Sequence, residues 1–96
     1  VSSTIEALDQ MVKICKENHV VAVLATYPEP VGDHAAYAPT VLVLNSRIRA
    51  LANTHGIPCV NLEAEFAGGT TLLEDDGLHP NDAGTQVMAI SFADLF

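Results

Sequence analysis

The sequence predicts an α/β fold, with a parallel sheet and helices on either face. Three observations lead to this prediction. Apolar residues recur at helical spacing in three segments, two short runs rich in apolar and β-branched residues separate them, and Gly- or Pro-containing stretches mark the boundaries. Because strands that alternate with helices pair in parallel through right-handed crossovers, the order helix, strand, helix, strand, helix indicates an α/β sandwich.

The first helix is predicted over about residues 4–17. Residues 3–6, Ser-Thr-Ile-Glu, have the form of a capping box, and the apolar positions that follow at helical spacing are Ile5, Leu8, Val12 and Cys15. The uninterrupted apolar run 20–25 then predicts a central strand covered on both faces. Residues 26–34, with two prolines and a glycine, are expected to form a loop at the carboxyl end of that strand.

A second helix is predicted from Pro39, which suits a first turn, until His55-Gly56 closes the pattern. Its buried face is marked by Val41, Leu44, Ile48 and Leu51. Residues 57–62 are expected to form a short second strand, and residues 63–66 a short turn of helix. Asn81 is expected to cap a last helix, whose apolar positions are Val87, Met88, Ile90, Phe92 and Leu95.

Two parallel strands leave unpaired amides and carbonyls along their outer edges. We therefore expect residues 1–96 to form part of one domain, with a further N-terminal segment, on the same or a separate polypeptide, supplying the missing strands. The chain on its own is expected to self-associate through its open strand edges and uncovered apolar faces.

Composition excludes several kinds of partner. Twelve acidic side chains against four basic ones give a formal net charge of −8, which would repel nucleic acid phosphates and anionic lipid headgroups. The apolar run 20–25 is far shorter than the roughly 20 residues that span a bilayer, so no membrane span is expected. Cys15 and Cys59 fall at apolar positions, and two cysteines make neither a disulfide framework nor a four-ligand zinc site.

The candidate functional segment is Asp76-Gly77-Leu78-His79-Pro80. Ligands of open α/β sheets bind beyond the carboxyl ends of the strands, where this segment is expected to return. A histidine that acts as general base needs one ring nitrogen free and the other held by an acceptor, which Asp76 can provide for His79. Spacing alone leaves a second interpretation open, because Asp-Asp-Gly is also a common turn and an Asp–His pair can be an ordinary capping arrangement.

Residues 76–84, Asp-Gly-Leu-His-Pro-Asn-Asp-Ala-Gly, resemble the last conserved block of the SGNH or GDSL family of esterases and lipases. That block is an Asp, two residues and a His, usually followed by Pro and often by a downstream Gly. Residues 20–28 and 59–62 are similar to two strands of the same family. The resemblance implies that residues 1–96 are the C-terminal half of a single domain, part of a three-layer α/β/α sandwich of flavodoxin-like type.

The resemblance also implies a Ser, His and Asp triad that hydrolyses carboxylic esters by acyl transfer to the serine, without a metal or another cofactor. His79 would be the general base and Asp76 its orienting partner. The family's nucleophile lies in a Gly-Asp-Ser block, and further oxyanion donors lie in Gly and Asn blocks, none of which occurs here. We therefore expect the isolated chain to be inactive, and ester hydrolysis to require the N-terminal half of the domain.

Two other classes of function remain open at this point. The same fold without catalysis would serve as a binding or assembly module. A weaker hypothesis is a metal-dependent hydrolase, in which Asp33 and His34 join Asp76 and His79 as ligands.

The remaining polar candidates have simpler interpretations. Glu63 and Glu65 are expected to point apart in a helical turn, so solvated surface is preferred over a glycosidase-type pair. His55, like His19, is expected at a helix end in a structural role. Tyr27 and its loop neighbour Tyr37 could line an acyl pocket or pack on the loop.

Overall fold

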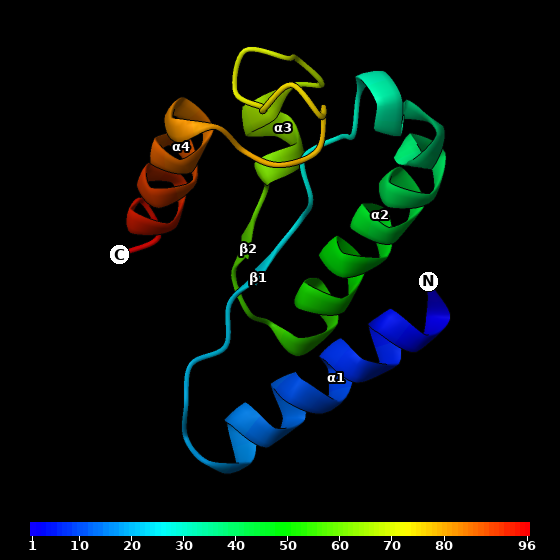
Figure 1. The fold of residues 1–96 in the computed structure, drawn as a ribbon. Helices are drawn as coiled ribbons and strands as arrows, with labels where there is room; N and C mark the ends of the chain where they lie inside the picture. The colour runs from blue at the N-terminus through cyan, green and yellow to red at the C-terminus, as the bar shows by residue number, and fades with distance from the viewer.

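In the computed structural model, which describes residues 1–96, two short parallel strands run between helices that lie on either side of them (Figure 1). The elements in order are α1 (Ser2–Glu17), β1 (Leu24–Ala25), the 3-10 helix η1 (Gly32–Tyr37), α2 (Ala38–His55), β2 (Cys59–Val60), α3 (Leu62–Phe66) and α4 (Asp82–Ala93). Leu24 pairs with Cys59 and Ala25 with Val60. The predicted α/β class with a parallel sheet is confirmed, whereas these residues do not form a full three-layer sandwich.

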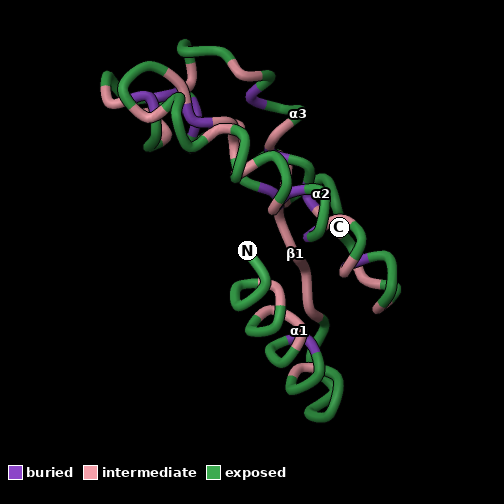
Figure 2. The backbone as a smooth tube through the Cα atoms, turned by 90° about the vertical axis from the view of Figure 1, so that its right-hand side faces the viewer, coloured by how far each residue is buried: buried purple, intermediate pink, exposed green.

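Helix α1 begins two residues before its predicted start, and the predicted capping box is wrong. Val1 occupies the N-cap position, and no side chain caps the helix. Ser3 therefore lies inside the first turn, where its hydroxyl cannot act as the cap. Val12 is the one buried residue of α1, and the rest of the helix is largely exposed (Figure 2).

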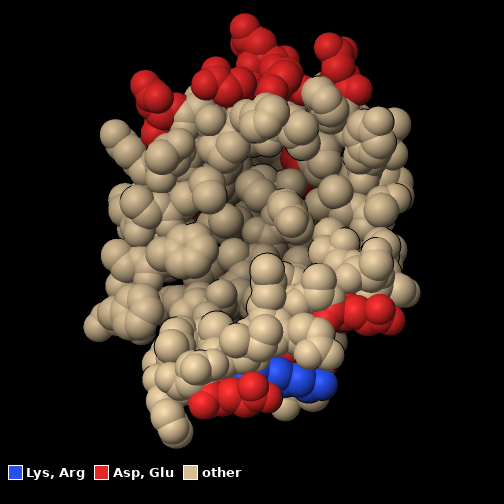
Figure 3. Space-filling view, turned by 60° about the horizontal axis from the view of Figure 1, so that its bottom comes forward, with Lys and Arg blue, Asp and Glu red and all other residues tan.

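The strand predicted over residues 20–25 is much shorter in the structure, and within this chain it is an edge strand and not a central one. Only Leu24 and Ala25 pair, and β1 has β2 as its single neighbour. Val20 and Val21 are 55% and 77% exposed, so the apolar run continues beyond the paired part into solvent. One face of the molecule is hollowed and mostly free of charged side chains in its middle, with acidic side chains and a basic one near its edges (Figure 3). The expectation of a buried central strand fails because no strand lies on the other side of β1.

Helix α2 agrees with its prediction at both ends. Proline occupies the first turn, and Gly56 closes the helix in a left-handed conformation with φ 65°. A residue that closes a helix in this way has a positive φ, and glycine adopts it without steric strain because it has no Cβ. Ile48 and Ala52 are buried where α2 packs against the strands. The second strand is confirmed only over its central residues, Cys59–Val60.

The apolar core on the α4 side holds the C-terminal part of the chain in place. Its buried members are Val60, Leu62, Phe66 and Leu73. Partly buried side chains from β1, α4 and the loops pack against them: Val23, Ala25, Val31, Leu72, Val87, Met88 and Phe92. Asn81 caps α4 as predicted, since its Oδ1 accepts a 2.9 Å hydrogen bond from the Gly84 amide.

None of the helices combines the length and the apolar character that crossing a bilayer requires.

Candidate active site

The structure places the carboxylate of Asp76 directly against the imidazole of His79. Asp76 Oδ2 lies 2.5 Å from His79 Nδ1. Asp76 Oδ1 accepts hydrogen bonds from the backbone amides of Leu78, at 2.9 Å, and His79, at 3.0 Å. The carboxylate is thus held at both oxygens. The His79 side chain is 71% exposed, which leaves Nε2 open to solvent.

These hydrogen bonds keep Asp76 ionised. The His79 ring, followed by the amides of His79 and Leu78, holds the pKa of Asp76 well below its usual range. Asp76 is therefore a carboxylate, which can only accept hydrogen bonds. His79 Nδ1 must carry the proton between them, and when the ring is neutral its Nε2 is the basic nitrogen.

The turn that carries the pair is closed by its own backbone. The Glu74 amide donates to the His79 carbonyl at 2.7 Å, and the Gly77 amide donates to the Glu74 carbonyl at 2.9 Å. Leu73 and Pro80 form an antiparallel bridge at the base of the turn. Asn81 Nδ2 donates to the Thr71 carbonyl at 2.9 Å and to the Leu73 carbonyl at 3.2 Å, so the residue that caps α4 also anchors the turn.

Gly77 lies where the turn touches the segment that follows β1. Its φ is 69°, and the Val31 amide donates to its carbonyl at 2.8 Å. A Cβ at this position would lie 2.1 Å from the Val31 carbonyl oxygen, so no other residue fits without movement. The sequence places Gly77 in an Asp-Asp-Gly stretch that is typical of a turn. It gave no sign that Val31 is the neighbour that requires it.

His34, which the metal hypothesis grouped with Asp76 and His79, does approach the same turn. Its Nδ1 donates to the backbone carbonyl of Asp76 at 2.7 Å, and not to the carboxylate. Asp33 is exposed. No group of three or more His, Cys, Asp or Glu side chains is placed to hold a metal ion.

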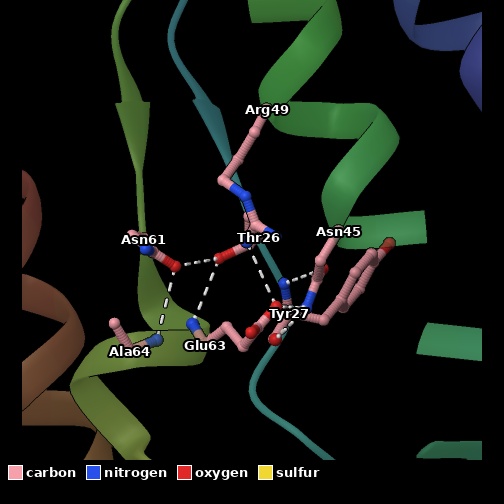
Figure 4. Close-up of polar contacts among 7 residues, drawn as sticks. All are labelled: Thr26, Tyr27, Asn45, Arg49, Asn61, Glu63 and Ala64. Carbon is pink, nitrogen blue, oxygen red and sulfur yellow. Dashed lines mark hydrogen bonds and ion pairs between the residues drawn. The ribbon is translucent and has the colours of Figure 1, made fainter. Parts of the chain in front are cut away.

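A second polar cluster fixes the carboxyl ends of both strands, and its centre is Asn45 on α2 (Figure 4). Asn45 is 0% exposed. Its Oδ1 accepts from the Tyr27 amide at 2.7 Å, and its Nδ2 donates to the Tyr27 carbonyl at 2.8 Å and to Glu63 Oε1 at 3.0 Å. The chain that leaves β1 is thereby bonded to α2 and, through Glu63, to α3.

Thr26 and Asn61 complete this cluster on the strand side. Thr26 Oγ1 donates to Asn61 Oδ1 at 3.2 Å and accepts from the Glu63 amide at 3.1 Å. Arg49 Nη1 lies 3.1 Å from Glu63 Oε1 as an ion pair. The interpretation of Glu63 as solvated surface is therefore wrong, because its carboxylate has two partners within the chain.

The sequence carries a signal for the burial of Asn45. The position lies four residues after Val41 and three before Ile48, on the face predicted to be buried. A polar side chain on such a face must find partners within the protein.

The remaining candidate residues either make contacts that hold the fold together or lie exposed with no site around them. His55 Nε2 bonds Asp9 Oδ1 at 2.6 Å and so joins α2 to α1. Tyr27 and Tyr37 are exposed, and the chain encloses no pocket for them to line. Both cysteines are free and partly buried, and burial raises the pKa of the Cys59 thiol.

An ionised Asp paired with a His on a loop of a parallel α/β fold can take part in general acid–base chemistry. The family model of the GDSL-like lipases and acylhydrolases matches residues 1–87. The chain belongs to the GDSL-like Lipase/Acylhydrolase family, as the resemblance of residues 76–84 predicted.

Solved structures share this fold. A GDSL-like lipase from Bacteroides thetaiotaomicron VPI-5482 superposes with a TM-score of 0.84 at 21% identity, over 98% of this chain and 51% of that one. A candidate acylhydrolase from Bacteroides fragilis NCTC 9343 gives a TM-score of 0.84 at 26% identity, over 98% and 50%. An alpha/beta hydrolase enzyme from the metagenome of Lake Arreo, Spain, gives 0.73 at 25% identity, over 94% and 44%.

The chain therefore spans about half the length of the solved structures that it matches. A search of curated protein sequences gave no match.

Proposed function

We propose that this chain supplies the general base, His79, and its orienting acid, Asp76, to a serine hydrolase that acts on carboxylic esters. The observation that carries the proposal is the hydrogen-bonded contact between Asp76 Oδ2 and His79 Nδ1, with Nε2 of the same ring exposed. Membership of a family of lipases and acylhydrolases supports the choice of ester substrates.

In the proposed mechanism His79 Nε2 takes the proton of a serine hydroxyl as its oxygen attacks the ester carbonyl carbon. The ionised Asp76 keeps the proton of His79 on Nδ1 and stabilises the imidazolium that forms. The imidazolium then gives its Nε2 proton to the departing alcohol, which leaves an acyl-serine. Water, deprotonated by the same nitrogen, releases the carboxylic acid and restores the serine.

We further propose that residues 1–96 are the C-terminal half of a single domain of three-layer α/β/α type, and that the serine belongs to the other half. The match over 98% of this chain but about half of each Bacteroides structure supports this division. So does the open edge of β1, which a further strand could pair. The same edge leads us to propose that the chain alone self-associates, which sedimentation at several concentrations would detect.

The test joins residues 1–96 to the proposed N-terminal half of the domain and measures p-nitrophenyl ester hydrolysis and labelling by a fluorophosphonate. We expect Asp76→Asn and His79→Ala each to lower kcat by roughly a thousandfold or more. Asp75→Asn, which alters the adjacent exposed acid, is the matched control and should keep its activity. Residues 1–96 alone should be inactive. Hydrolysis that survives both site substitutions would overturn the proposal, and a joined protein without labelling or hydrolysis would favour a binding module.

A further inference from the structure

The turn that carries Asp76 is held from outside at two consecutive backbone carbonyls. His34 Nδ1 donates to the Asp76 carbonyl at 2.7 Å, and the Val31 amide donates to the Gly77 carbonyl at 2.8 Å. Both donors belong to the segment that follows β1. The only hydrogen bond that the Asp76 carbonyl makes within the chain is the one from His34.

The His34 ring is itself held in position. Its backbone amide donates to the Val31 carbonyl at 3.1 Å, at the start of η1. The ring of Tyr37, one turn further along η1, lies 6.2 Å away between centroids. Because a carbonyl oxygen can only accept, Nδ1 of His34 must carry a proton. This holds for the neutral Nδ1–H tautomer and for the imidazolium, so the bond does not require one charge state.

The Asp76–Gly77 peptide group connects Asp76 to the amides of Leu78 and His79 that hold its carboxylate. The group is planar, so it turns as a unit about the bonds on either side of it. If it rotated, the amides of Leu78 and His79 would move away from Asp76 Oδ1, and the imidazole would leave Oδ2. Within the turn the group is held at one end only, where the Gly77 amide donates to the Glu74 carbonyl at 2.9 Å, and its other end, the Asp76 carbonyl, is left to an outside donor.

We propose that His34 is a positioning residue for the Asp76–His79 pair, which acts by fixing the Asp76–Gly77 peptide group through its Nδ1–H. Its catalytic consequence rests on the function proposed above. Its geometric consequence does not, so the two can be tested separately.

Three substitutions of His34 distinguish the effect of losing the hydrogen bond from the effect of losing the aromatic ring. His34→Ala removes both, His34→Phe keeps an aromatic ring beside Tyr37 without a donor, and His34→Asn places an amide N–H close to the position of Nδ1. Asp33→Asn, an exposed neighbour in the same 3-10 helix, is the matched control. Circular dichroism establishes which variants fold.

The geometric test uses NMR of residues 1–96 to follow exchange of the His79 Nδ1 proton and of the Leu78 and His79 amides with water. We expect exchange to be roughly five- to tenfold faster in His34→Ala and His34→Phe, because one hydrogen bond of the turn is lost. His34→Asn and Asp33→Asn should exchange as the unsubstituted chain does. If His34→Ala fails to fold, His34→Phe and His34→Asn give the same comparison.

The catalytic test measures ester hydrolysis by the joined protein. We expect kcat to fall by roughly ten- to a hundredfold in His34→Ala and His34→Phe, with KM nearly unchanged, because a small displacement of the base slows proton transfer. His34→Asn should recover most of the loss.

Two results would overturn the inference: exchange and kcat in His34→Phe equal to those of the unsubstituted protein, or His34→Asn no better than His34→Phe. Full activity in His79→Ala would instead refute the proposed function, while the exchange rates would still decide the role of His34.

Discussion

The side chain of Asn45 pairs with the backbone of Tyr27 at both of its polar groups, as a neighbouring strand would. Asn45 Oδ1 accepts from the Tyr27 amide and Nδ2 donates to the Tyr27 carbonyl. The remaining proton of Nδ2 goes to Glu63. A single buried amide therefore replaces the backbone partner that the chain loses where β1 ends.

Asn45→Ala should lower the free energy of unfolding by about 2–3 kcal/mol, because it leaves buried polar groups without partners. Urea unfolding followed by circular dichroism measures the change. Asn53→Ala, at an exposed position of the same helix, is the matched control and should shift stability by no more than about 0.5 kcal/mol. Equal effects of the two substitutions would show that Asn45 contributes no more than a surface residue.

Gly84→Ala should destabilise the chain by about 1–3 kcal/mol through overpacking. An added Cβ would lie 2.1 Å from the Leu72 carbonyl oxygen, so α4 would have to move away from the loop before it. Gly69→Ala is a suitable control, because its Cβ would only reach ordinary contact with the Phe66 carbonyl oxygen, at 3.5 Å. Thermal unfolding of both variants compares them, and a harmless Gly84→Ala would contradict the close approach.

Gly77→Ala should cost more than Gly56→Ala, although both residues have similar positive φ. Placing Cβ in the left-handed conformation costs about 1–2 kcal/mol at either position. Only at Gly77 does the new Cβ also collide with the Val31 carbonyl oxygen, whereas nothing lies within 4 Å at Gly56. Urea unfolding of the two variants gives the difference in the free energy of unfolding. Equal losses of stability would mean that the turn can move away from Val31 without cost.

The contact between α1 and α2 should weaken in acid. Hydrogen bonds from Lys13, the larger cause, and from His55 lower the pKa of Asp9. A carboxyl whose pKa is lower in the folded chain contributes stability above its unfolded pKa and loses it as the pH falls through the folded value. Stability should therefore decline below about pH 4, and Asp9→Asn should remove part of that decline. Unfolding at several pH values measures it, and identical slopes for Asp9→Asn and the unsubstituted chain would contradict it.

Sequence reasoning succeeded where a local signal decides the structure. Gly56 ends α2 and Asn81 caps α4 because each acts on backbone groups a few residues away. It failed at the start of α1, where a good capping pattern was not used, and at Val20 and Val21, whose burial depends on neighbouring strands. The local Asp76–His79 contact was foreseen from its spacing. The contact of His34 with Asp76 joins residues 42 positions apart and has no sequence signal.

The geometry around Asn45 also limits which amino acids the position can accept. Aspartate would lose both donated hydrogen bonds and set a second carboxylate beside Glu63, while glutamine would need room for one more methylene in a site without exposed surface. Libraries built to diversify this scaffold should therefore leave position 45 unchanged, although it never meets a substrate in the proposed mechanism. Its tolerance to substitution is set by the backbone that it holds and not by the reaction.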